Sequence, residues 1–175
     1  FFTGLASGAT VVISQHYGAK QEDGVQKALH TAYAFSVVGG IIISIMGILI
    51  TRPLLKLMNT PDNIIDLSAT YLCIYFAGLV FVFIYNVGAG ILRAVGDSRR
   101  PLYFLILCCF INIILDIILI VFLKMGVAGA AIATTFSQGI SAVMVTVTLC
   151  RTTDIFRLRV KKIRFHAQPM GMILS

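Results

Sequence analysis

Residues 29–50 read LHTAYAFSVVGGIIISIMGILI, a run that contains no Asp, Glu, Lys or Arg. A membrane-spanning helix needs roughly 20 predominantly apolar residues, so this run is long enough to cross a bilayer. A soluble helix of the same length would instead carry a charged face opposite its apolar face. The run therefore predicts a transmembrane helix and decides the class of fold.

Three further complete runs of this kind follow along the chain, at Leu67–Leu92, Leu102–Leu123 and Val127–Leu149. Of the 175 residues, 58% are hydrophobic and 12% are charged, and the mean hydropathy is +0.95. An ordinary soluble domain has about 25% charged residues. This composition excludes a disordered chain, a disulfide scaffold and a conventional cytosolic enzyme. We expect an all-α fold, a polytopic bundle of transmembrane helices.

Both ends of the chain fall in apolar runs. The first run, Phe1–Gln15, is too short to cross a bilayer, and another begins near Pro169. We therefore expect an internal fragment of a longer protein. Residues 1–150 are predicted to lie in one bundle, 151–168 to form a basic linker, and 169–175 to begin a further helix.

The basic residues divide unequally between the two sides of the predicted bundle. Three of the 14 Lys and Arg fall on one side, at Arg52, Lys56 and Lys124. The other 11 fall on the opposite side: Lys20, Lys27, Arg93, Arg99, Arg100, Arg151, Arg157, Arg159, Lys161, Lys162 and Arg164. By the positive-inside rule the richer side is cytoplasmic, which predicts a multi-pass protein of the cell membrane.

The basic character of the chain, with a pI near 9.5, is therefore not interpreted as a sign of nucleic-acid binding. The segment 151–164 holds six basic residues and one Asp, and it directly follows a predicted span. A basic cluster in that position favours contact with anionic lipid headgroups. We expect a topology determinant and a bilayer-contacting linker.

Short turn signals separate the spans. Thr60-Pro61-Asp62 predicts a helix start, with Thr60 as N-cap, Pro61 at the first helical position and an acid in the first turn. Lys124-Met125-Gly126 is so short that the two flanking spans are predicted to form an antiparallel hairpin.

Asp116 is the only acidic residue deep within a complete span. An ionisable group in the membrane is expensive to bury and indicates a functional site by default. Asn112 lies four residues earlier, which places both side chains on the same helix face, one turn apart. Thr134 lies as far after the hairpin turn as Asp116 lies before it, roughly 10 Å below the outer boundary at 1.5 Å per residue.

If the two faces meet, a carboxylate, an amide oxygen and a hydroxyl converge on one polar spot. Hard cations take oxygen ligands, and removal from water disfavours the charged form of a carboxyl group, so this cluster suits Na⁺ or a proton. The alternative is structural: Asp116 and Asn112 would hydrogen-bond to neighbouring helices, and the Thr134 hydroxyl would bond to its own helix.

Other chemistries find no support in the sequence. There is no G-x-x-x-x-G-K-[ST] phosphate loop, no G-x-S-x-G motif and no C-x-x-C pair. The four Cys and three His show no metal-ligand spacing. We expect a protein that is not an enzyme, with no cofactor other than Na⁺ or H⁺ at this cluster.

Several motifs resemble the multidrug and toxic compound extrusion (MATE) family. They are GLASG at 4–8, SQHYGA at 14–19, RAVGD at 93–97 before Pro101, NIILD at 112–116 and GVAGAAIAT at 126–134. The resemblance covers nearly the whole chain in the same order and spacing. It implies helices two to six and the start of helix seven of a twelve-helix transporter with two six-helix lobes.

The resemblance also implies an activity, the exchange of organic cations or drugs for H⁺ or Na⁺ by a prokaryotic exporter. Family members bind the cation in the N-terminal lobe with an Asn and an Asp one turn apart on helix five and a Thr on helix six. Asn112, Asp116 and Thr134 match these positions. A further Asp on helix one, the rest of that helix and the C-terminal lobe lie outside this sequence.

Two other functions stay open. The first is a lipid-linked sugar flippase or polysaccharide exporter of the same superfamily; the absence of Lys and Arg deep in the complete spans favours cationic or neutral cargo instead. The second is a structural membrane subunit in which Asp116 pairs with a partner helix.

Overall fold

A computed structural model of the protein describes residues 2–152, and every regular element in this range is a helix. The elements are α1 (Phe2–Gly18), α2 (Glu22–Leu57), α3 (Asp62–Ala94), α4 (Arg99–Asp116), the π-helical segment η1 (Ile117–Phe122) and α5 (Gly126–Arg151). The predicted linker, beyond its first two residues, and the predicted helix start at 169–175 lie outside the described residues.

The four complete spans predicted from the sequence are confirmed. Within residues 2–152, four segments are long and apolar enough to cross a membrane: Glu22–Leu57, Asp62–Ala94, Arg99–Phe122 and Gly126–Arg151. Large apolar side chains cover their outer surface, with Leu49, Leu57 and Phe122 more than 70% exposed. Such a surface suits the hydrocarbon core of a bilayer, where all backbone polar groups must be satisfied within the helix.

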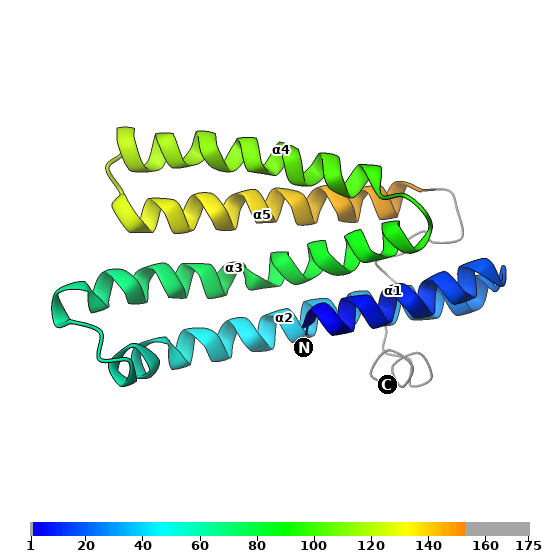
Figure 1. The fold of residues 1–175 in the computed structure, drawn as a ribbon, viewed down its shortest axis with the longest axis horizontal. Helices are drawn as coiled ribbons and strands as arrows, with labels where there is room; N and C mark the ends of the chain where they lie inside the picture. The colour runs from blue at the N-terminus through cyan, green and yellow to red at the C-terminus, as the bar shows by residue number, and fades with distance from the viewer. Residues whose placement is uncertain (1, 153–175) are drawn as a thin grey trace.

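Consecutive helices run antiparallel, and their order in space differs from their order in the chain (Figure 1). α3 packs between α2 and α5, and α4 packs on the other side of α5. α1 lies against α2 and α3. The α1–α2 and α3–α4 turns lie at one end, called here the inner end after the predicted orientation, and the α2–α3 and η1–α5 turns lie at the outer end (Figure 1).

The turns at the two ends follow local chemistry, with one correction. Gly96, in the α3–α4 turn, has a φ of +89°, which glycine adopts without strain. The Oδ1 atom of Asp97 accepts the backbone N–H of Arg100 at 3.2 Å and so caps the start of α4. The prediction of Thr60 as the N-cap of α3 is wrong. Pro61 is the N-cap, with ψ of 140°, and the helix begins at Asp62.

A buried apolar cluster lies near the inner end and joins four helices. Its members are Val12, Ile13, Val25, Ala28, Leu29, Ala32, Tyr33, Val87, Ile91, Leu92, Val145 and Leu149. Two polar contacts reinforce it. The Tyr33 hydroxyl on α2 is hydrogen-bonded to the Thr146 hydroxyl on α5, and the Tyr85 hydroxyl donates to the Pro101 carbonyl at 2.9 Å.

Glycines allow close approach of the helices where α2 meets α3. A Cβ atom added at Gly40 would lie 2.9 Å from the Cα atom of Val80, a backbone atom that cannot move aside. Small residues at such contacts are typical of membrane helices, because close packing drives their association in lipid. Gly40 therefore fixes the spacing of α2 and α3.

We expect Gly40→Ala to lower the thermal unfolding midpoint in detergent, because overpacking a helix contact costs about 1–3 kcal/mol. Gly18→Ala is the matched control, since a Cβ atom there meets nothing within 4 Å. Equal midpoints for the two variants would contradict the assignment of Gly40 as a contact glycine.

Candidate cation site in the α4–α5 hairpin

Asn112 and Asp116 occupy the last turn of α4, and both residues are partly buried. The Nδ2 atom of Asn112 and the Oδ1 atom of Asp116 are shielded from solvent and have no hydrogen-bond partner. Among the described residues, only Ser44 Oγ on α2 shares this condition. Two of the three unsatisfied buried side-chain atoms thus lie within one helical turn.

An unsatisfied buried polar group costs roughly 1–3 kcal/mol, and more when it is charged. A partner for these groups would remove that cost. Asp116 is an acceptor, and a half-turn of the Asn112 amide exchanges Nδ2 for Oδ1 and places an oxygen where the nitrogen now lies. The turn can therefore present two oxygen ligands to a cation, or a carboxylate to a proton.

Thr134 lies in α5, the helix against which α4 and η1 pack. Its hydroxyl donates to the Ala130 carbonyl in the preceding turn at 3.0 Å, and its own carbonyl accepts the Ser137 hydroxyl at 2.9 Å. The structure therefore brings Asn112 and Asp116 together, and it shows no hydrogen bond between either of them and Thr134. Convergence of all three groups on one cation stays a prediction.

The helix type changes directly after Asp116, which the sequence did not predict. Ile117–Phe122 is π-helical, and the Leu123 N–H donates to the Ile118 carbonyl, five residues back, at 2.9 Å. π-helical turns inside α-helices are rare and occur frequently at functional sites. The six residues read IILIVF, with no Gly or Pro to signal the change, so the uniform apolar run predicted an uninterrupted α-helix to Leu123.

The hairpin turn after η1 is tightly constrained. Lys124 has a φ of 53° and Gly126 a φ of 56°, both in the left-handed region. The Met125 N–H donates to the Leu119 carbonyl at 2.9 Å. The sequence prediction of an antiparallel hairpin at Lys124–Gly126 is confirmed.

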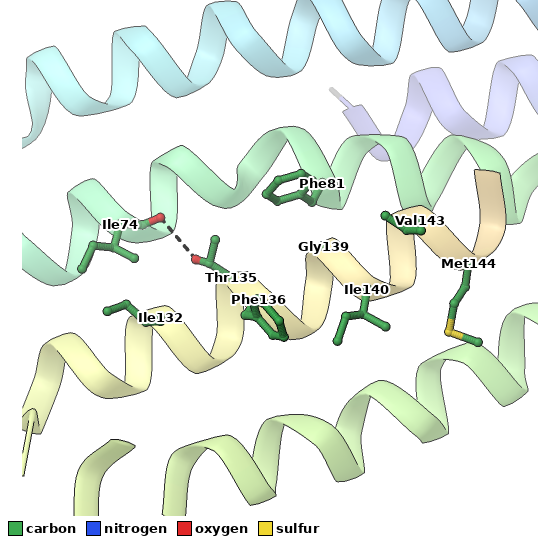
Figure 2. Close-up of a pocket in the computed structure, with 9 residues that line it drawn as sticks. All are labelled: Ile74, Phe81, Ile132, Thr135, Phe136, Gly139, Ile140, Val143 and Met144. Atoms are coloured by element: carbon green, nitrogen blue, oxygen red, sulfur yellow. Dashed lines mark hydrogen bonds between the residues drawn. The ribbon is translucent and has the colours of Figure 1, made fainter. Parts of the chain in front are cut away.

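An apolar pocket of about 510 Å³ is formed by side chains of α3 and α5 (Figure 2). It is lined by Ile74, Phe81, Ile132, Thr135, Phe136, Gly139, Ile140, Val143 and Met144. Its one side-chain hydroxyl, that of Thr135, donates to the Ile74 carbonyl at 3.3 Å and thus joins α5 to α3. None of the three candidate cation-site residues, Asn112, Asp116 and Thr134, lines this pocket.

A second pocket, of about 410 Å³, lies at the outer end between α2, α3 and α5 and includes Tyr71 and Val127. Tyr71 stacks on Tyr75, with ring centroids 6.3 Å apart and planes 8° from parallel.

Comparison with known proteins identifies a family and several relatives that this chain resembles. The MatE family model matches residues 1–118. The probable multidrug resistance protein YoeA of Bacillus subtilis is 38% identical over 141 residues, which cover 78% of this chain and 30% of that protein. The multidrug export protein MepA of Staphylococcus aureus (strain MSSA476) is 28% identical over 172 residues, which cover 96% of this chain and 37% of that protein.

Solved structures agree. The inward-facing conformation of a multidrug resistance MATE family transporter of the MOP superfamily matches with a TM-score of 0.91 and 27% identity, over 99% of this chain and 40% of that one. A MOP superfamily transporter from Pyrococcus furiosus, described as having a binding pocket of reverse polarity that suggests a different function, matches with a TM-score of 0.90 and 27% identity, over 99% of this chain and 38% of that one.

The chain thus spans between 30% and 40% of the length of these relatives. The family model covers more than half of it, and the matched solved structures share its arrangement of helices. This chain, with its unpartnered Asn112 and Asp116 on one turn of a membrane-spanning helix, belongs to the MatE family.

Proposed function

We propose that this chain forms most of the N-terminal lobe of a secondary active transporter that exports organic cations or drugs in exchange for H⁺ or Na⁺. The observation that carries the proposal is the pair of buried, unpartnered groups on Asn112 and Asp116. The printed names of several relatives, including multidrug resistance and multidrug export proteins, support the efflux activity. We propose that a further helix on the N-terminal side and a C-terminal lobe, which the family resemblance implies, complete the transporter.

In the proposed mechanism, cation occupancy at Asp116 biases the equilibrium between inward-open and outward-open states. A ligand shifts such an equilibrium only by its difference in affinity for the two states. Binding to a desolvated carboxylate is sensitive to small movements, because electrostatic interactions strengthen as water is excluded. A rearrangement of the α4–α5 hairpin against its neighbours would therefore change cation affinity and drive drug release outward.

The runner-up is a lipid-linked sugar flippase or polysaccharide exporter. One solved relative of reversed pocket polarity has the same arrangement of helices, so the fold does not choose between cargoes. The complete spans here carry no deep Lys or Arg for an anionic phosphate headgroup. A structural subunit without transport activity is the third candidate, and it would need a partner for the Asp116 carboxylate.

The orientation and the lipid contact of the chain belong to the same proposal. Nine Lys and Arg lie within residues 2–152, and six of them lie at the inner end. We infer a cytoplasmic inner end in a bacterial cell membrane, with the basic linker 151–168 against anionic headgroups. Organic cations are the proposed small-molecule partners, and no nucleic acid is involved.

Cation-driven efflux tests the central claim. In proteoliposomes that contain the whole transporter, Asp116→Asn should reduce efflux of a fluorescent organic cation by at least about tenfold, because the ion ligand loses its charge but keeps its size. Asp62→Asn, an exposed acid at the start of α3, is the matched control and should transport normally. Unchanged efflux from folded Asp116→Asn protein would make Asp116 a packing residue. Absence of efflux from the wild type would favour the flippase.

Substitutions of the three site residues should change the cation concentration for half-maximal efflux to different extents. Asn112→Ala should raise the cation concentration for half-maximal efflux by about tenfold or more, because its amide has no other partner. Thr134→Val should have a smaller effect, since the Thr134 hydroxyl already donates to Ala130. Cation titration of efflux measures both. A larger effect at Thr134 than at Asn112 would contradict this ranking.

Orientation is tested by labelling single cysteines in a cysteine-free background. Met58→Cys, at the outer end, should react with a membrane-impermeant maleimide in intact cells. Ser98→Cys, at the inner end, should react only after permeabilisation. Both positions are exposed, so accessibility within the fold does not differ. The reverse labelling pattern would overturn the orientation.

A further inference from the structure

Gly129 lies where the backbone of η1 touches α5. A Cβ atom added at Gly129 would lie 3.2 Å from the carbonyl carbon of Leu119 and 3.1 Å from the Cβ atom of Met125. The first of these is a backbone atom, so relief requires movement of η1 itself. Elsewhere on α5, a Cβ atom at Gly139 would meet Phe81 at 3.8 Å, an ordinary contact.

Leu119 is held against the start of α5 from two directions. Its carbonyl accepts the Met125 N–H at 2.9 Å, and its backbone rests on Gly129. The turn between them contains two residues in the left-handed region, Lys124 and Gly126, and so has little freedom to adjust. Leu119 is therefore a fixed point of the hairpin.

The π-helical register connects this fixed point to Asp116. A π-helical turn closes over one more residue than an α-helical turn. If Ile117–Phe122 were α-helical with the same number of residues, Asp116 would be turned by about one residue, roughly 100°, relative to the hairpin turn that follows Phe122. Asn112 would turn with it, since α4 is α-helical between the two. The direction in which both side chains face thus depends on the register of η1 and on its contact with α5.

We propose that Gly129 is a positioning residue for the cation site: by admitting the backbone of η1 against α5, it fixes the π-helical register that aims Asn112 and Asp116 at their ligand. This inference rests on the proposed function, because the ligand is the coupling cation. Gly129 has no side chain with which to bind an ion. A role in packing alone would lower stability without changing cation affinity.

The first experiment compares Gly129→Ala with Gly139→Ala in the whole transporter, by titrating the coupling cation in an efflux assay. Gly129→Ala should raise the half-saturating cation concentration by about tenfold or more, as loss of an orienting contact does at ion sites, with a smaller change in maximal rate. Gly139→Ala should leave both unchanged. Equal half-saturation in the two variants would overturn the proposal.

A deletion tests the register independently of Gly129. Val121 is 62% exposed, and its removal takes away the one extra residue of the π-helical turn. The segment can then form an ordinary α-helix, and the side chain of Asp116 keeps its direction relative to the hairpin turn. Cation half-saturation should stay near that of the wild type. If the deletion variant lost as much cation affinity as Gly129→Ala, the effect of Gly129 would not come from the helical register.

Crosslinking separates failure of this inference from failure of the proposed function. In a cysteine-free background, Asp116→Cys with Thr134→Cys should form an oxidant-induced disulfide, which Gly129→Ala weakens and Gly139→Ala preserves. This readout needs no transport. A disulfide unaffected by Gly129→Ala would overturn the positioning role. If Gly129→Ala weakened the disulfide but Asp116→Asn left efflux unchanged, the positioning role of Gly129 would be supported and the cation site would be rejected.

Discussion

Asp116 places a carboxyl oxygen without a hydrogen-bond partner in a helix that is otherwise mostly apolar. This unsatisfied group is the main constraint on the α4–α5 hairpin. The Oδ1 atom of Asp116 is buried, and the nearest polar neighbour in sequence, Asn112, is equally unsatisfied. A chain selected for stability alone would replace both with leucine. Three irregularities follow this pair along the chain: a π-helical segment, two left-handed residues in the turn, and a glycine at the backbone contact.

The rest of the bundle holds this hairpin from one side. α3 lies between α2 and α5, and the buried cluster near the inner end joins α1, α2, α3 and α5. α4 touches that cluster only through the partly buried Phe104 and packs mainly on α5. The element that carries Asp116 is therefore at the periphery of the described bundle, fastened by the turn, by Gly129 and by the hydrogen bond of Tyr85 to Pro101.

The spans and the Asn112–Asp116 pair could be predicted because they depend on local sequence alone. Length and absence of charge define each span, and a spacing of four residues places two side chains on one helix face. Which helices touch could not be predicted, since spans that are apolar all round carry no pattern to mark the buried face. The π-helical segment was missed for a related reason: IILIVF is compatible with either register, and the choice is made by contact with Gly129. The donation of the Thr134 hydroxyl to Ala130 was the structural alternative considered at the outset.

The spatial order of the helices has a consequence for biosynthesis. Because α4 packs mainly on α5, the polypeptide must complete α5 before α4 can reach its main neighbour, whereas α3 can already pack on α2. A nascent α4 that entered lipid alone would carry Asp116 into hydrocarbon with no helix to shield it. The short turn at Lys124–Gly126 offers a solution, because it lets α4 and α5 leave the insertion machinery as one unit. Lateral release of the pair would then place α5 against a waiting α3 and shield the acid in the same step.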